Sequence, residues 1–180
     1  MSVASYQFET LLWYYGVMKE DLTKLSIKEL MDRGICPTCL NRETGGAIYG
    51  DNSHTQLYID EDIEIVFVPN PRSRGHLAII SVPHYKNMLE APDYLNEKII
   101  RYSKFLMNEL VKAYGCETVY LCTMCDGKIN HYHIQLIPRY KEEAIGSKNF
   151  VKERKAYVFE EDKFRYLRDK LRKSDLAKPQ

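Results

Sequence analysis

Residues 130–139 read NHYHIQLIPR, and this stretch alternates polar and apolar side chains. If it forms an extended strand, successive side chains point to opposite faces. One face then carries the apolar set Tyr132, Ile134 and Leu136. The other face carries the polar set His131, His133 and Gln135, whose Cα atoms follow one another at about 6–7 Å. A row of three polar groups would need several buried hydrogen-bond partners if it were only structural, so it indicates a ligand or metal site.

Four further segments have the composition of strands. They are TQLYID at 55–60, IEIVFVP at 63–69, HLAIISVP at 76–83 and TVYLCTM at 118–124. An acidic turn separates the first two, and a tight turn of sequence CDGK, at 125–128, is expected to join the last to the histidine-bearing strand. Such short connections favour an antiparallel sheet of about five strands over repeated crossover units.

Helical patterns precede, interrupt and follow these strands. An aromatic-rich helix is expected over about 6–19, and a shorter one over 26–34, where a serine and a glutamate have capping-box spacing. The clearest helix spans 93–114, with apolar residues at the helical period and a glycine after its end. A last amphipathic helix spans 161–173. The predicted fold class is therefore α+β, with the long helix packed on the sheet and helical extensions at both ends.

Length and charge limit the domain organisation and the partners of the chain. Its 180 residues suffice for one domain with a substantial core. We expect a single domain over 1–180, with a helical extension at 1–34, a core at about 35–140, and a basic arm with a helix at 141–180. The 26 basic and 25 acidic residues balance, which disfavours a strongly basic nucleic-acid-binding protein.

The chain has no feature of a membrane or secreted protein. No apolar run approaches the roughly 20 residues that a membrane span requires. The first residues, MSVASYQFETLLWYYG, lack the basic start and apolar centre of a signal peptide. We therefore expect a cytoplasmic, reducing setting and no membrane partner.

Four of the five cysteines form two Cys-x-x-Cys pairs, Cys36/Cys39 and Cys122/Cys125. In a reducing setting such pairs indicate metal or redox chemistry before disulfides. The first pair lies in ICPTCLNRETGG, at 35–46, which is expected to form a knuckle-like loop with zinc-ligand spacing. Both pairs together could form a metal site of four cysteines, although a spacing of three places Cys122 and Cys125 on opposite faces of a strand unless the chain turns there. The absence of any metal is a further alternative.

The sequence also resembles a known family. HYHIQLI, at 131–137, fits the pattern His-φ-His-φ-Gln-φ-φ, where φ is apolar, and so resembles the histidine triad (HIT) superfamily of nucleotide hydrolases and transferases. NPRSRGHLAIISVPHYKNMLE, at 70–90, is similar to that family's Gly-His, strand and Pro/His region. The resemblance covers about residues 35–139.

The resemblance implies chemistry for the polar face. His133 would attack the α-phosphorus of a nucleotide and form a covalent nucleotidyl-histidine. His76 would lie near it, with a partly solvated position at the start of a strand as the alternative. Gln135 stands where hydrolytic members carry a third histidine, and its amide can hold a phosphoryl oxygen but cannot protonate a leaving group. This favours phosphate leaving groups and resembles the branch of hexose-1-phosphate uridylyltransferases and dinucleoside-polyphosphate phosphorylases.

The resemblance also implies a metal site. Zinc-bearing members join a Cys-x-x-Cys pair to two histidines, which correspond by position to His84 and His131. Together with Cys36 and Cys39 these would form a closed, structural zinc site of two cysteines and two histidines. Such a site would tie the N-terminal loop to the strand that carries His133.

Phosphate contacts are expected from several loops. Asn70, Lys128 and Asn130 correspond loosely to polar binding residues of the family. Arg72 and Arg74 could contact distal phosphates or belong to a solvated basic loop. The basic segment 146–159, GSKNFVKERKAYVF, could contact a nucleotide or polyphosphate, reach a partner subunit, or pack as a solvated segment.

The predicted function is therefore a nucleotidyl transferase or phosphorylase that uses a covalent nucleotidyl-histidine. Its substrate would be a dinucleoside polyphosphate, a nucleoside polyphosphate or a nucleotide sugar. A hydrolase with water as the acceptor and a non-catalytic module that binds nucleotides or RNA ends are the alternatives. Family members commonly pair, so a homodimer is a further expectation.

Overall fold

The computed structural model describes residues 21–174 and residue 176, and the helix expected over about 6–19 lies outside them. Within the described residues, five strands form one antiparallel sheet of order β1-β2-β3-β5-β4. The strands are β1 (Gln56–Ile59), β2 (Ile63–Phe67), β3 (Leu77–Ser81), β4 (Thr118–Cys122) and β5 (His133–Arg139). The histidine-bearing strand β5 is interior, between β3 and β4, and the α+β architecture expected from the sequence is confirmed.

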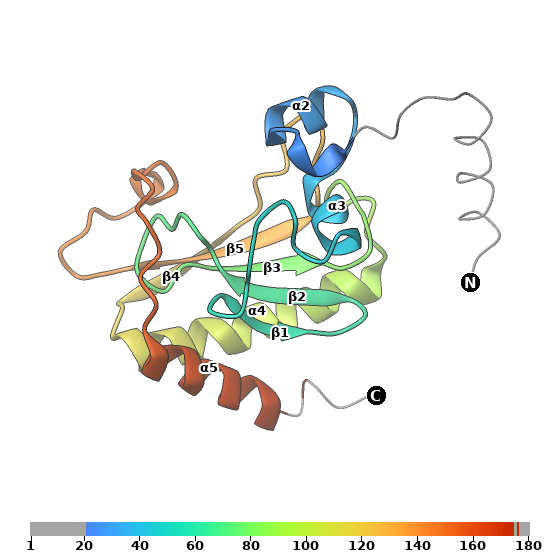
Figure 1. Ribbon diagram of the computed structural model, residues 1–180. Coiled ribbons are helices and arrows are strands. Elements are labelled where there is room, and N and C mark those ends of the chain that lie inside the picture. Colours follow the sequence, from blue (N-terminus) through green and yellow to red (C-terminus); the bar gives the residue numbers. More distant parts are fainter. Residues whose placement is uncertain (1–20, 175, 177–180) are drawn as a thin grey trace, which may run out of the picture.

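Two helices cover one face of the sheet (Figure 1). They are α4 (Asp93–Tyr114) and α5 (Glu161–Lys173), with the bounds expected from their apolar periods. Leu106 of α4 and Leu167 of α5 are fully buried in the same hydrophobic core as Ile79 and Ile134 of the sheet. Each such aliphatic side chain contributes about 1.5–3 kcal/mol on burial, so this side of the sheet is a stable base for the opposite face.

Short-range signals explain two helix ends. Ser26 precedes α2 (Ile27–Asp32), and its side chain and that of Glu29 bond reciprocally to each other's backbone N–H groups. This is the capping box that the spacing indicates. α4 ends at Gly115, whose φ of 66° is left-handed and favours glycine. Among the helices of the described residues, none has the length and apolar character needed to cross a membrane.

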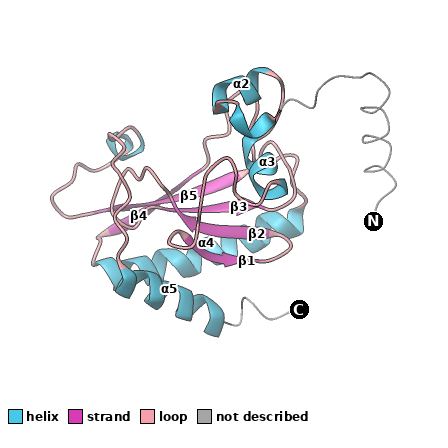
Figure 2. Cartoon of the chain, in the orientation of Figure 1, coloured by secondary structure: helices cyan, strands magenta, loops and turns pink. Residues whose placement is uncertain are grey.

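The interpretation of residues 35–46 as a loop is wrong. They contain helix α3 (Pro37–Glu43), which Figure 2 shows beside the sheet. Cys36 is its N-cap residue. Pro37 opens the helix, where its missing N–H needs no partner and its fixed φ suits the helix. The first cysteine pair is thus held at the start of a helix.

The connection from β4 to β5 also differs from the expectation. β5 begins at His133 rather than at His131, so residues 123–132 form a long connection in place of the tight turn expected at 125–128. The N–H of Tyr132 donates to a backbone carbonyl in the segment after β3 at 2.7 Å. The chain next to His131 is therefore held by that segment.

Two short 3-10 helices complete the described elements. η1 (Leu22–Lys24) precedes α2, and η2 (Ser147–Phe150) begins the arm that runs from β5 to α5. This arm passes the end of the sheet on the side of β4 before it reaches α5 (Figure 1).

Candidate active site and metal centre

The face of the sheet turned away from α4 and α5 carries the polar residues of β5. On the neighbouring strand β3, Ala78 lies opposite Gln135 and Ile80 lies opposite His133. A cavity of about 410 Å³ opens on this face, and both polar residues line it together with Val66. Small and branched apolar side chains therefore form a floor beside the two polar groups, in a cavity of the size that holds small ligands.

His133 has a defined ring orientation. Its Nδ1 lies 2.9 Å from the backbone oxygen of His131. Because a carbonyl oxygen only accepts, Nδ1 carries the hydrogen, and the lone pair of the neutral ring lies on Nε2. This nitrogen is 3.2 Å from the side-chain nitrogen of Gln135. Thr123 donates its hydroxyl hydrogen to the His133 carbonyl at 2.9 Å and holds the backbone in place.

His76 is buried on the same face, so its interpretation as partly solvated is wrong. Only 1% of its surface is exposed. Its Nδ1 accepts the N–H of Arg72 at 3.1 Å, which places the ring hydrogen on Nε2. Burial lowers the pKa of His76 to about 4, and the positive charge of Arg154 adds to this effect, so the ring is neutral near pH 7.

Two buried polar atoms beside His133 have no hydrogen-bond partner within the described part of the chain. They are the Nε2 of His76 and the Oε1 of Gln135. The first is a donor and the second an acceptor. Buried polar groups in folded proteins are nearly always paired, so the Gln135 oxygen, in the cavity that His133 lines, indicates a site for a polar ligand. His76 lines another cavity and lies close enough to Gln135 for that side chain to raise the pKa of His76 against the larger effect of burial.

A second polar cluster lies at the start of β5. The ligand atoms of Cys36, Cys39, His84 and His131 all lie within 4.8 Å of one another. The Sγ of Cys39 is 3.2 Å from His84 Nδ1, and the Sγ of Cys36 is 3.4 Å from His131 Nδ1. A tetrahedral zinc ion with ordinary bond lengths places sulfur and nitrogen ligands about 3.5 Å apart. The donor set and its spacing fit that ion.

The surroundings of this cluster also fit a metal. The Nε2 of His131 donates to the backbone oxygen of Ser81 at 2.8 Å, which leaves Nδ1 as the free ligand atom. Burial lowers the pKa of His131 to about 4. Burial, followed by the neighbouring Cys36, raises the pKa of the Cys39 thiol to about 12, and a dication would offset that cost by stabilising the thiolate.

The second cysteine pair lies outside this cluster. Cys125 is beside the other histidine, with its Sγ 3.8 Å from His133 Nδ1 and 4.0 Å from the His131 oxygen. Cys122 ends β4, where it lies opposite Gln135. The structure thus brings the first pair together with two histidines rather than with Cys122 and Cys125.

Helix α3 connects the two clusters, a connection that the sequence interpretation missed because it expected a loop. It carries Cys39 into the metal cluster and Thr38, Asn41 and Arg42 into the wall of the cavity. Arg42 donates to the carbonyl of Ser81 at 3.0 Å and forms an ion pair of 2.8 Å with Glu64, another cavity residue. Whatever fixes the start of α3 therefore also fixes one wall of the cavity.

The three expected phosphate-binding residues lie outside the linings of the two cavities that include His133 and His76. Asn130 accepts the N–H of Gly127 at 2.9 Å and so stabilises its own loop. Lys128 is exposed. Asn70 is exposed too, and its backbone oxygen accepts from Arg154 at 2.9 Å. Arg154 itself, from the basic segment 146–159, lines the cavity with His133.

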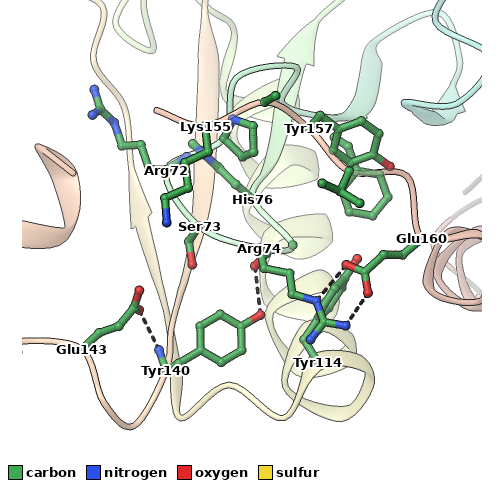
Figure 3. A pocket seen from close by; sticks show the side chains of 15 residues that line it. Arg72, Ser73, Arg74, His76, Tyr114, Tyr140, Glu143, Lys155, Tyr157 and Glu160 are labelled. Carbon is green, nitrogen blue, oxygen red and sulfur yellow. Dashed lines mark hydrogen bonds and ion pairs between the residues drawn. The ribbon is translucent and has the colours of Figure 1, made fainter. Parts of the chain in front are cut away.

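A second cavity, of about 660 Å³, is lined by His76 and by the loop that precedes β3 (Figure 3). Two lining residues of this cavity, Arg74 and Glu160, form an ion pair with each other. Tyr140 donates its hydroxyl hydrogen to the Arg74 carbonyl at 3.0 Å. Arg72 lines the same cavity. Of the two arginines suggested for distal phosphates, Arg74 is therefore already paired with a carboxylate.

The chain is similar in sequence to known proteins. The model of the family described as "Protein similar to CwfJ C-terminal" matches residues 26–152. An uncharacterized HIT-like protein of Borreliella burgdorferi is 28% identical over 96 residues, which cover 49% of this chain and 69% of that protein. A second uncharacterized HIT-like protein, from Methanocaldococcus jannaschii, is 26% identical over 100 residues, which cover 52% and 75%.

Solved structures with low sequence identity share the fold. A zinc-bound histidine triad family protein from Mycobacterium smegmatis has a TM-score of 0.59 at 17% identity, covering 79% of this chain and 97% of that one. A hypothetical histidine triad nucleotide-binding protein from Sulfolobus tokodaii has a TM-score of 0.55 at 21% sequence identity. The match covers 76% of this chain and 89% of that one. Plasmodium falciparum diadenosine triphosphate hydrolase has a TM-score of 0.52 at 13% sequence identity. The match covers 69% of this chain and 81% of that one.

Proposed function

Because the chain belongs to the HIT-like family of proteins similar to CwfJ C-terminal, we propose that it binds a nucleotide on the polar face of the sheet and transfers the nucleotidyl group through His133. The observation that carries this proposal is the orientation of the His133 ring. Its Nδ1–H donates to a backbone oxygen at 2.9 Å, so the lone pair lies on Nε2, in the wall of the cavity. There it accepts the amide N–H of Gln135 at 3.2 Å, and attack requires this amide to turn from the ring to the phosphoryl group. An imidazole with one nitrogen anchored in this way presents the other nitrogen as a nucleophile.

The reaction proceeds in two balanced steps. In the first, the lone pair of His133 Nε2 forms a bond to the α-phosphorus of the nucleotide, and the bond from phosphorus to the bridging oxygen breaks. The leaving group takes that electron pair. In the second step, an acceptor oxygen attacks the same phosphorus, and Nε2 leaves with its lone pair restored. The names of two structural neighbours, a nucleotide-binding protein and a diadenosine triphosphate hydrolase, agree with this substrate class.

Gln135 sets the preference for the leaving group. Its amide lies next to the attacking nitrogen and can donate to a non-bridging phosphoryl oxygen, but it has no acidic proton to give to a departing oxygen or nitrogen. Leaving groups that depart as stable anions are therefore favoured. This supports a transferase or phosphorylase with a phosphate-type leaving group, in preference to an enzyme for amine or alkoxide esters.

We also propose that Cys36, Cys39, His84 and His131 hold one structural zinc ion. Zinc in a closed site of four protein ligands cross-links the segments that supply them and takes no part in the reaction. Here it would join α3 to the residue two positions before His133. The 2.8 Å bond from His131 to Ser81 and the shared wall of the cavity support this positioning role. The whole chain would act as one domain, since α5 packs into the core of the sheet.

Covalent trapping tests the proposal. The full-length protein is incubated with α-³²P-labelled ATP, GTP or diadenosine tetraphosphate, quenched in alkali and separated under denaturing conditions. We expect a label that is stable to alkali and released by acid, as a phosphoramidate is, and that is absent in His133→Asn. His54→Asn is the matched control, because His54 is exposed, lies in tilted contact with Phe159 and is not in the lining of the His133 cavity.

Each outcome of the trapping experiment has a meaning. Label that persists in His133→Asn contradicts the assignment of the nucleophile. Binding of nucleotide without any label in the wild type would favour the non-catalytic module instead. If label forms, the products made with and without inorganic phosphate distinguish a phosphorylase from a hydrolase.

A further inference from the structure

The second cysteine pair lies where the edge strand β4 meets the polar face of the sheet. Cys122 is the last residue of β4 and lies opposite Gln135 of β5. Directly opposite residues of neighbouring strands point to the same face, so the Cys122 thiol shares the face of His133 and Gln135. The Sγ of Cys125 is 3.8 Å from the Nδ1 of His133. The two thiols therefore flank the two polar residues of the proposed site.

A threonine between the cysteines connects them to His133. The hydroxyl of Thr123 donates to the His133 carbonyl at 2.9 Å, and the same hydroxyl oxygen is 3.4 Å from the Sγ of Cys125. Residues 123–126 belong to no strand or helix, so no regular ladder of hydrogen bonds fixes their backbone. A change of backbone between the two cysteines would therefore move the hydroxyl that holds His133.

The two thiols are chemically available. Both are free and half-buried, and neither belongs to the metal cluster of the first cysteine pair. A disulfide needs Cα atoms about 4.4–6.8 Å apart, whereas three extended steps of chain span about 10 Å. Closure of Cys122 on Cys125 therefore requires a turn at residues 123–124. That turn bends the segment that carries Thr123.

We infer that Cys122 and Cys125 are a reversible disulfide site, with a small disulfide such as oxidised glutathione as the co-reactant, and that closure withdraws Thr123 from His133. The disulfide site stands on the placement of the two thiols. Its effect on turnover rests on the proposed function, because it acts through the position of His133. In the open dithiol the His133 carbonyl keeps its donor at 2.9 Å. In the disulfide the Cys125 sulfur is drawn towards β4 and the backbone of His133 loses that bond.

The exchange proceeds in two balanced steps. One cysteine thiolate attacks a sulfur of glutathione disulfide, a new sulfur–sulfur bond forms, and one glutathione leaves with the electron pair of the broken bond. The second cysteine thiolate then attacks the protein sulfur of this mixed disulfide, and the second glutathione leaves. The two cysteines lose two electrons, glutathione disulfide gains them, and the two thiol protons pass to the glutathione thiolates. Excess reduced glutathione reverses both steps.

Peptide mapping tests the disulfide site without turnover. The full-length protein, with its zinc content measured, is equilibrated with mixtures of reduced and oxidised glutathione, quenched in acid, alkylated and mapped by mass spectrometry. We expect a linkage between Cys122 and Cys125 that is lost when reduced glutathione is restored. Cys122→Ser and Cys125→Ser should each carry one glutathione on the remaining thiol. Cys116→Ala is the matched control and should form the same linkage, because Cys116 is 3% exposed and lies outside the pair.

The ring of His133 provides the second readout. In ¹⁵N-histidine NMR spectra its signals, identified by their loss in His133→Asn, should shift on oxidation, whereas those of the exposed His54 should not. Nucleotide labelling should slow about 10- to 100-fold, because a displacement of about 1 Å at a reactive group has effects of this size. Both effects should be absent when Cys122 and Cys125 are both replaced by serine.

Two results would overturn the inference. One is the absence of a linkage between Cys122 and Cys125 in the most oxidising mixture, including the case in which only Cys36 and Cys39 become linked. The other is a linkage that leaves the His133 ring signals unchanged. Failed labelling of the reduced protein, with the linkage formed and the ring signals shifted, would refute the nucleophile and keep the disulfide site.

Discussion

Two polar clusters lie two residues apart on the same stretch of chain, and they differ in how their polar atoms are satisfied. Around His131 the ligand atoms face one another, and the remaining ring nitrogen donates to Ser81. Around His133 the side chains of His133 and Gln135 line a cavity, and the Oε1 of Gln135 has no hydrogen-bond partner in the described residues. A cluster that closes on itself suits a structural ion, whereas an open one suits a ligand that comes and goes.

Replacing the nucleophile should have the largest effect on the open cluster and almost none on the closed one. We expect His133→Ala to lower kcat at least about 10³-fold, which is about 4 kcal/mol of barrier, because no other group of the polar face can take over the attack. Zinc content and unfolding temperature should stay near those of the wild type. Steady-state kinetics with diadenosine tetraphosphate measures kcat. Metal analysis measures the zinc content, and thermal unfolding measures the unfolding temperature. A loss of zinc in this variant would mean that the two clusters are not separate.

Replacing a cysteine of the closed cluster should remove the metal. Cys36→Ser should reduce zinc from one ion per chain to near zero and lower the free energy of unfolding by about 4 kcal/mol, as the loss of a structural metal does. Metal analysis of protein purified without added zinc and denaturant unfolding are the measurements. Cys122→Ser is the matched control, because that cysteine lies outside the cluster, and it should keep its metal. Loss of zinc in Cys122→Ser with retention in His84→Ala would point to a site of four cysteines instead.

The amide of Gln135 belongs to the open cluster and lies beside the proposed nucleophile. Gln135→Ala should lower kcat about 10²- to 10³-fold, or about 2.7–4 kcal/mol, if its amide donates to a phosphoryl oxygen in the transition state. Gln135→His would supply an acid and should narrow the gap in rate between a nucleoside phosphoramidate and a dinucleoside polyphosphate. Equal rates for the two substrates in the wild type would remove the main support for the transferase over the hydrolase.

The smallest expected effect concerns pH and His76. In the unfolded chain this ring takes up a proton below about pH 6.5, whereas in the folded chain its pKa is about 4. The unfolded state therefore binds more protons between these values, and the free energy of unfolding falls as the pH drops from about 6.5 towards 4, by at most about 3–4 kcal/mol from this group. His76→Asn keeps an acceptor for the Arg72 N–H and should flatten that part of the curve. Identical pH profiles of unfolding for the two zinc-loaded proteins would contradict the buried, neutral state of His76.

Local patterns in the sequence determine most of the fold. The bounds of α4 and α5 follow from apolar residues at the helical period, and α2 follows from the capping box of Ser26 and Glu29. The alternation over residues 132–134, at the start of β5, places Tyr132 and Ile134 in the core and His133 on the opposite face. These features can be predicted from the sequence because each depends on residues only a few positions apart.

Tertiary contacts determine the conformation and position of the segments between the regular elements. Helix α3 was missed because a proline and two cysteines suggested a knuckle, and the long connection before β5 was missed because its shape depends on bonds to the segment after β3. Arg154 illustrates the same limit, since its basic segment permitted three interpretations from sequence. Only the bonds of the arm to residues 69–71 bring it to the cavity of His133. A charge on an irregular segment has no periodic signal to orient it, so its position is set by contacts between residues more than 80 positions apart, such as Arg154 and Asn70.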